Sequence, residues 1–182
     1  SGVTELRKWL TLSVVDFAEI FRGHGRATIS VREVGCTAAE GFDRCAVTYE
    51  RSWHLDQQGD QCDLAWLLVY ALRPKVIHLG TPCTKMCLIG QGHVDQSTHM
   101  QNEFTRKVLL HQEAEKLGGS VENPKGSLLL EQPEFVGHFG NMDTPKPPWA
   151  FYRTEGCQFH VVYPGEDDPG RPMQKAHYWM AN

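Results

Sequence analysis

Apolar residues follow two spacings along the chain, and these spacings predict strands and helices that alternate. Short apolar runs bounded by Gly, Pro or Asp are typical of strands, whereas apolar residues spaced three or four apart are typical of helices. The strands expected are residues 10–21, 37–42, 75–81 and 120–123, with another strand and a short helix within 44–54. The helices expected are residues 26–34, 64–72 and 97–117, and a short helical segment is expected within 126–135. This order predicts an α/β protein whose mostly parallel sheet carries helices on both faces.

Turn and capping residues set the boundaries of these elements. Gly23 and Gly25 indicate a turn between the first strand and the first helix, and Gly35 ends that helix. Asp63 is expected to cap the second helix, which stops before a proline. Gly59-Asp60 is interpreted as a turn, and Gly118-Gly119 as the end of the long helix.

The C-terminal part changes character, because residues 156–163 and 174–181 are rich in β-forming residues. The polar loop 164–172 between them suits an antiparallel pair that completes the sheet. Residues 138–148 are rich in Gly and Pro and are expected to form a loop. No linker divides the chain, so residues 1–182 are interpreted as a single domain.

Composition narrows the classes of function. A formal net charge of −4 gives no general attraction to nucleic acid. No apolar run is long enough to span a membrane. The six cysteines are scattered, which indicates a reducing, intracellular compartment. Cys83 and Cys87 have the spacing of half a metal site, but no second close pair completes it, so no metal is expected.

Candidate functional residues fall at the ends of the predicted strands, where ligands of parallel sheets bind. A glycine turn allows close approach of backbone to ligand, although a Gly-x-Gly is also an ordinary tight turn. Asp43, or Glu40 nearby, could hold ribose hydroxyls or be a solvated carboxylate, and Asp60 could meet an adenine amino group or belong to a turn. Cys83 follows Pro82 before a polar loop, so its thiol is either exposed and reactive or a small buried side chain.

Glu122 lies in an apolar strand, where an unpaired carboxylate is costly, and this favours a role for it. Together, the order Glu-x-Phe-x-Gly-x-Gly, acidic strand end, Gly-Asp, Gly-x-Pro-Cys and Glu-Asn resembles the catalytic core of the cytosine C5 DNA methyltransferase family. The resemblance covers about residues 14 to 125 and is strongest to short methylase-like domains of eukaryotic mobile elements and microbial genomes. It implies a Rossmann-like methyltransferase fold ending in an antiparallel β-pair.

The resemblance also implies roles. Phe21, Gly23 and Gly25 would cradle S-adenosylmethionine, with Asp43 or Glu40 on its ribose. Phe42 would lie against the adenine and Asp60 would meet its amino group. Cys83 would be the nucleophile that attacks C6 of cytosine, with Pro82 shaping its turn. Glu122 would hold the cytosine ring and Asn123 would brace the site. Apart from the resemblance, the cationic side chains expected to guide the nucleic acid are Arg22, Lys85, Lys125 and Arg171.

The family's Arg-x-Arg motif, its large target-recognition region and its closing motif have no clear match here, and Pro124 stands where Val is commoner. A partner subunit or another region would then supply recognition. The alternatives are a weak or inactive methyltransferase-like domain that binds cofactor or nucleic acid, an RNA cytosine methyltransferase, an amino-methyltransferase, and a dinucleotide-fold binding protein. The substrate expected is cytosine in DNA, with single-stranded DNA or RNA as the other options.

Overall fold

The structure is a computed structural model that describes residues 14–82, 95–155 and 176–182. The chain divides into two compact units, one of Ser1–Pro82 with Val94–Ser120 and the other of Cys83–His93 with Val121–Asn182. The division falls within the strand Gly118–Pro124, between Ser120 and Val121. The single domain expected from the sequence therefore consists of two compact units.

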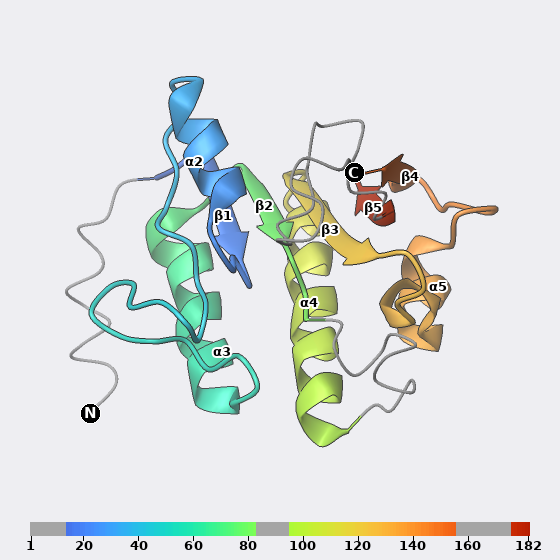
Figure 1. The fold of residues 1–182 in the computed structure, drawn as a ribbon, viewed down its shortest axis with the longest axis horizontal. Helices are drawn as coiled ribbons and strands as arrows, with labels where there is room; N and C mark the ends of the chain where they lie inside the picture. The colour runs from blue at the N-terminus through green and yellow to red at the C-terminus, as the bar shows by residue number, and fades with distance from the viewer. Residues whose placement is uncertain (1–13, 83–94, 156–175) are drawn as a thin grey trace, which may run out of the picture. The chain divides into compact units, whose positions relative to one another are not determined.

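The fold is α/β, with one five-stranded mixed sheet in the order β1-β2-β3-β5-β4 (Figure 1). The strands are β1 (Phe17–Ile20), β2 (Val76–Leu79), β3 (Gly118–Pro124), β4 (Ala150–Glu155) and β5 (Ala176–Ala181). The helices are α2 (Arg26–Glu33), α3 (Gln58–Trp66), α4 (Gln96–Ala114) and α5 (Pro133–Phe139), with a π-helix η2 (Leu67–Leu72) and a 3₁₀ turn η4 (Leu129–Glu131). This architecture is compatible with a Rossmann-like fold.

The first unit is built on the parallel pair β1 and β2, in register from Phe17↔Val76 to Ile20↔Leu79. Ala18, Ile20 and Ile77 are fully buried, as expected for parallel strands covered by other elements. Asp95 is the N-cap of helix α4, and its carboxylate accepts hydrogen bonds from the amide and hydroxyl of Thr98 at 2.8 and 2.7 Å. The boundary of the long helix therefore follows from a side-chain cap.

The second unit contains the antiparallel pair β4 and β5, in register from Ala150↔Ala181 to Glu155↔Ala176. The pair confirms the antiparallel ending expected from the sequence, although its first strand starts at Ala150; the expected strand 156–163 lies outside the described residues. Helix α5 adds an aromatic core in which the rings of Phe139 and Trp149 meet edge to face, with centroids 4.8 Å apart.

Several predicted boundaries are wrong. The segment 37–42 joins β1 only through the single bridges Phe17↔Ala38 and Ile20↔Phe42, and 44–54 contains neither helix nor strand beyond a Thr48↔Arg51 bridge. Helix α3 begins at Gln58, so Asp60 lies in its first turn and not in a separate turn. The carboxylate suits that position because a helix N-terminus carries partial positive charge.

Asp63 is not a cap, because it lies inside α3, where its carboxylate pairs with Arg51 at 2.7 Å. Similarly, Gly118 and Gly119 do not end the long helix but begin β3. Helix α4 ends at Ala114, and Lys116 adopts the left-handed conformation, with φ 58°, that the sequence had suggested for a glycine. By contrast, Gly35 follows the end of α2 as expected, and it has a left-handed φ of 85°.

Candidate functional site

The glycine loop that follows β1 turns through three left-handed residues. Phe21, Gly23 and Gly25 have φ angles of 57°, 51° and 67°. Gly25 is the N-cap of α2, and its amide donates to the carbonyl of Arg22 at 2.8 Å. A Cβ at Gly23 would meet no atom within 4 Å, so this glycine is required by its backbone angle and not by crowding. The loop thus presents backbone to open space at the start of a helix.

Glu19, on β1, connects this strand to the first turn of α2, on the other side of the glycine loop. It is only 6% exposed, and its Oε2 accepts hydrogen bonds from the amide and hydroxyl of Thr28 at 2.8 and 2.6 Å. Its carboxylate therefore satisfies an amide of the first turn of α2, the role that an N-cap side chain usually fills. The sequence signal was available, since Glu19 is an acidic residue within a buried strand.

The structure brings the glycine loop and Asp43 together. The amide of Gly23 donates to Oδ2 of Asp43 at 3.1 Å, and the amide of Cys45 donates to Oδ1 at 2.9 Å. The backbone beneath is fixed by a hydrogen bond from the amide of Phe21 to the carbonyl of Phe42 at 2.8 Å. Glu40 lies exposed on the same segment. The carboxylate of Asp43 therefore lies directly beside the glycine loop.

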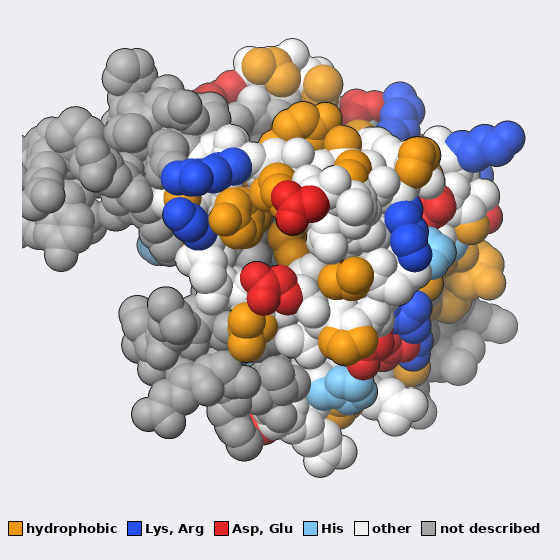
Figure 2. Space-filling view, turned by 90° about the vertical axis from the view of Figure 1, so that its right-hand side faces the viewer, with side chains coloured by type: hydrophobic (Ala, Val, Ile, Leu, Met, Phe, Trp, Pro, Cys, Tyr) orange, Lys and Arg blue, Asp and Glu red, His pale blue; other side chains and the backbone are white. Residues whose placement is uncertain are grey.

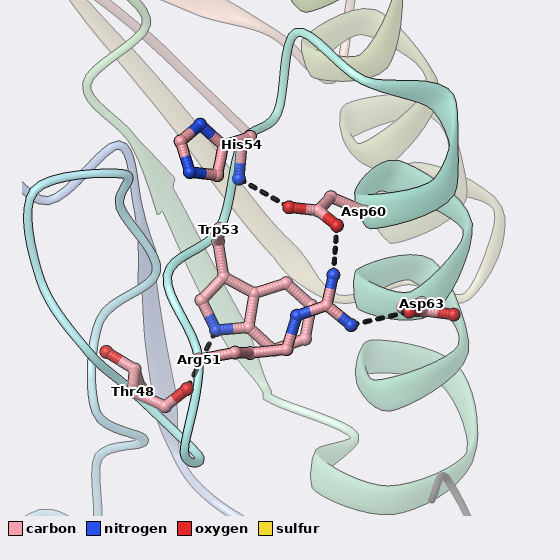
Figure 3. Close-up of polar contacts among 6 residues, drawn as sticks. All are labelled: Thr48, Arg51, Trp53, His54, Asp60 and Asp63. Atoms are coloured by element: carbon pink, nitrogen blue, oxygen red, sulfur yellow. Dashed lines mark hydrogen bonds and ion pairs between the residues drawn. The ribbon is translucent and has the colours of Figure 1, made fainter. Parts of the chain in front are cut away.

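Phe42 and Asp60 belong to an aromatic and ionic cluster shown in part in Figure 3. Phe42 is fully buried, with its ring 5.3 Å from that of Trp53 and 5.6 Å from that of Tyr49. Burial also raises the pKa of the Tyr49 hydroxyl. Because Phe42 has no exposed surface, it supports this side of the unit from within and does not present its ring to a ligand.

Arg51 connects Trp53 to the first turns of α3. Its guanidinium carbon lies 4.5 Å from the centre of the Trp53 ring, and it pairs with both Asp60 and Asp63 (Figure 3). The other oxygen of Asp60 accepts from the amide of His54 at 2.5 Å. Asp60, predicted to meet an adenine amino group, thus already has a protein partner on each oxygen. No pattern in the sequence indicates the role of Arg51.

The end of β2 lies beside the glycine loop. The amide of Gly80 donates to the carbonyl of Ile20 at 3.0 Å, and a Cβ on Gly80 would lie 3.0 Å from the carbonyl oxygen of Phe21. Thr81 is buried, with its hydroxyl 2.9 Å from that of Thr105, and Pro82 is exposed. The backbone that precedes Pro82 is therefore fixed at Gly80, next to the glycine loop.

Cys83 itself, with Lys85 and Arg171, lies outside the described residues. Their predicted roles remain predictions.

In the second unit, Glu122 and Asn123 lie near the end of β3. Oε1 of Glu122 is 3.1 Å from Nε2 of His177 on β5, with the two side chains 22% and 25% exposed. Asn123 is buried; its side-chain amide donates to the carbonyl of Glu122 at 2.7 Å and accepts from the hydroxyl of Ser127 at 2.6 Å. Asn123 thus braces the backbone of Glu122. Lys125 is exposed just beyond, with its amide bonded to the carbonyl of Ala176.

A cavity of about 220 Å³ in the first unit lies between α3 and α4 and contains none of the predicted site residues. Its lining includes Leu68, Phe104 and Val108, which are core positions of these helices. Within the described parts of the chain, no group of three His, Cys, Asp or Glu residues is arranged to hold a metal ion. In the same parts, no helix has both the length and the apolar character needed to cross a membrane.

In comparisons with known proteins, no protein-family model matches the chain, and no curated protein resembles it at a significant level.

Proposed function

We propose that the protein transfers a methyl group from S-adenosylmethionine to C5 of cytosine in DNA through a covalent cysteine adduct. The observation that carries the proposal is the hydrogen bond between Gly23 and Asp43, beside which lies Gly80, the residue after strand β2. A glycine loop and a carboxylate at the carboxyl ends of parallel strands suit a bound nucleoside. In the sequence, Cys83 follows Gly80 by three residues.

The residues of the first unit fit the cofactor at its ribose. Gly23 leaves open space above a left-handed backbone, and Asp43 or the exposed Glu40 would accept hydrogen bonds from ribose hydroxyls. Each oxygen of Asp43 uses one lone pair on a backbone amide, which leaves another for a ligand. At the adenine end, Asp60 would bind only with acceptor capacity left over from Arg51 and His54.

The chemistry proposed for the chain begins with the Cys83 thiolate, which would form a bond to C6 of cytosine. Glu122, as a carboxylic acid, would donate its proton towards N3 as electron density moves into the ring, which makes C5 nucleophilic. The cofactor would supply an electrophilic methyl group to C5. As the bond to the methyl group forms, Glu122 would take back the N3 proton. Solvent water would then remove the C5 proton, the electrons of that C–H bond would re-form the C5–C6 double bond, and the Cys83 thiolate would leave C6. Asn123 would hold Glu122 in place, because its side-chain amide donates to the carbonyl of Glu122.

The substrate expected is a cytosine that is already accessible, because removing a base from the stack costs a few kcal/mol. The formal net charge of −4 offers little general attraction to phosphates. On the face drawn in Figure 2, Lys and Arg side chains are interspersed with acidic and hydrophobic ones and do not form a continuous basic surface. Binding guided by Lys125 and a few other cations should therefore be weak and salt-sensitive.

The test is transfer of a labelled methyl group from the cofactor to single-stranded, mismatched and duplex oligonucleotides, followed by analysis of the nucleosides. The proposal predicts 5-methylcytosine, formed faster on single-stranded or mismatched DNA than on a perfect duplex. Label in N4-methylcytosine would replace the C5 mechanism with an amino-methyltransferase, and label only in RNA would replace the substrate. No label in any substrate, with the cofactor bound, would leave a methyltransferase-like binding domain.

A further inference from the structure

Arg22, in the middle of the glycine loop, has a side chain whose path is fixed by two glycines. A Cβ built on Gly41 would lie 2.4 Å from Cδ and 2.7 Å from Cβ of Arg22, and one built on Gly25 would lie 3.7 Å from Cδ, Nε and Cζ. Gly41 has no left-handed backbone angle that would otherwise require glycine. Gly41 is therefore required because the aliphatic part of the Arg22 side chain occupies the space that a Cβ would need.

Among the residues that the structure describes, no hydrogen-bond or ion-pair partner is found for the guanidinium of Arg22. Nε of Arg22 is buried without a hydrogen bond, and among the described residues no carboxylate forms an ion pair with this side chain. Arg22 as a whole is half-buried, so its terminal nitrogens remain reachable from outside. A cation that is partly desolvated and unpaired is unfavourable unless an anion completes its surroundings.

The neighbourhood of Arg22 favours an anion. The first turn of α2 has no acidic residue of its own, its N-cap offers no side-chain hydrogen bond, and Arg26 lies there exposed. The two carboxylates nearby, Glu19 and Asp43, accept hydrogen bonds from the amides of Thr28 and Gly23, and neither forms an ion pair with Arg22. The partial positive charge of the helix N-terminus adds to the charge of the arginine. The planar guanidinium matches a carboxylate, which it can bind through two parallel hydrogen bonds.

We infer that Arg22 binds the carboxylate at the amino-acid end of S-adenosylmethionine. This inference rests on the proposed function. The carboxylate is the anionic group of that molecule, and the ribose is assigned to Asp43 or Glu40; Asp43 is bonded to the residue that follows Arg22. Arg22 would thereby distinguish ligands that carry the amino-acid group from those that carry only the thioether nucleoside.

The experiment measures binding of two ligands by calorimetry: S-adenosylhomocysteine, and 5′-methylthioadenosine, which keeps the nucleoside and sulfur but lacks the amino-acid group. The variants are Arg22→Gln, Arg22→Lys and the exposed control Arg44→Gln. We expect the native chain to prefer S-adenosylhomocysteine and Arg22→Gln to weaken that ligand by about tenfold to a hundredfold, as loss of a charge-assisted hydrogen bond does. Binding of 5′-methylthioadenosine should be unchanged, Arg22→Lys should be intermediate, and Arg44→Gln should match the native chain.

Each other outcome overturns the inference in a recognisable way. If the native chain binds both ligands equally, or Arg22→Gln weakens both to the same extent, Arg22 does not bind the carboxylate, and the proposed function is unaffected. If Arg22→Gln weakens only the retention of single-stranded DNA, the guanidinium holds a phosphate. If the native chain binds neither ligand, the proposed function fails and this inference fails with it. The comparison of ligands on the native chain does not depend on the folding of any variant.

Discussion

Nε2 of His177 lies 3.1 Å from Oε1 of Glu122, so that β5 holds the carboxyl group of β3 that is proposed to contact cytosine. An acid acts on a bound base only when it is correctly oriented, and His177 is placed to fix that orientation. It is a positioning residue, because it would act through Glu122. The sequence analysis assigned it no role, since nothing in the sequence indicates which strand lies beside β3.

We therefore predict that His177→Ala lowers the turnover rate of methyl transfer by about tenfold or more, as expected when an acid is no longer oriented. Binding of S-adenosylhomocysteine should not change. His177→Gln, whose side-chain amide nitrogen can take the place of Nε2, should restore part of the rate, and Tyr178→Phe on the same strand is the matched control. Equal rates for His177→Ala and His177→Gln would show that the side chain does not act through this contact.

Arg51 should stabilise the first unit because it joins Trp53 to two carboxylates of α3. We predict that Arg51→Ala lowers the free energy of unfolding by about 1–3 kcal/mol, the range for losing part-buried charged hydrogen bonds and a cation–π contact. The exposed Arg44→Ala should change it by less than about 0.5 kcal/mol. Urea denaturation measures both, and similar values for the two variants would contradict the role assigned to Arg51.

His78 on β2 gives the stability a dependence on pH. It is buried, with Nδ1 3.0 Å from the Ser120 hydroxyl, and burial lowers its pKa from 6.5 to about 4. As the pH falls, His78 is protonated in the unfolded chain before it is protonated in the folded chain. The free energy of unfolding is therefore highest above about pH 6.5 and decreases as the pH falls towards 4. The shift corresponds to roughly 3 kcal/mol.

Accordingly, His78→Gln should flatten the decline in unfolding free energy between pH 6.5 and 4, whereas the exposed His99→Gln should not. Denaturation curves at several pH values in that range provide the measurement. An unchanged slope in His78→Gln would show that another group causes the decline.

Asp16 should act in a more acidic range. It accepts hydrogen bonds from the Thr37 hydroxyl and from Lys75 at 2.7 Å each, and these bonds, that of Lys75 foremost, hold its pKa well below the usual value. Its contribution is present above about pH 4, the pKa of an unfolded Asp, and declines as the pH falls further. Asp16→Asn should therefore be less stable than the native chain at pH 7, with a difference that narrows below pH 4. Asp143→Asn, at an exposed position, should show no such convergence.

The extent to which the sequence predicted the structure differs between elements for physical reasons. Helix α2 was predicted well because glycines precede and follow it, and strand β2 because of its apolar run. Apolar spacing does not explain α2, since Ile29 and Val34 are exposed and its buried residue is Thr28. The segment 44–54 was not, because its shape comes from the indole of Trp53, which donates to the carbonyl of Thr48 and stacks beneath Arg51. Such contacts join side chains that no periodicity connects.

The candidate site shows the same contrast. The proximity of the glycine loop and Asp43 was predicted from the rule that parallel strands end at a common edge, whereas the hydrogen bond between Gly23 and Asp43 was not. The burial of Phe42 and the pairing of Asp60 with Arg51 did not, since each depends on the fold of the intervening turn. The requirement for glycine at position 41 was not predicted, because it comes from the side chain of Arg22, nineteen positions away in the sequence.

The most direct test of the proposed chemistry is capture of the covalent intermediate. In an oligonucleotide that contains 5-fluorocytosine, the fluorine at C5 cannot leave as a proton, so the bond between Cys83 and C6 should persist after methyl transfer. Mass spectrometry of the native chain with this oligonucleotide and S-adenosylmethionine should show a one-to-one adduct, and peptide mapping should place it on Cys83. The adduct should be absent in Cys83→Ser and retained in Cys62→Ser, at an exposed free cysteine. A native chain that methylates cytosine without forming this adduct, or an adduct that survives in Cys83→Ser, would contradict the account.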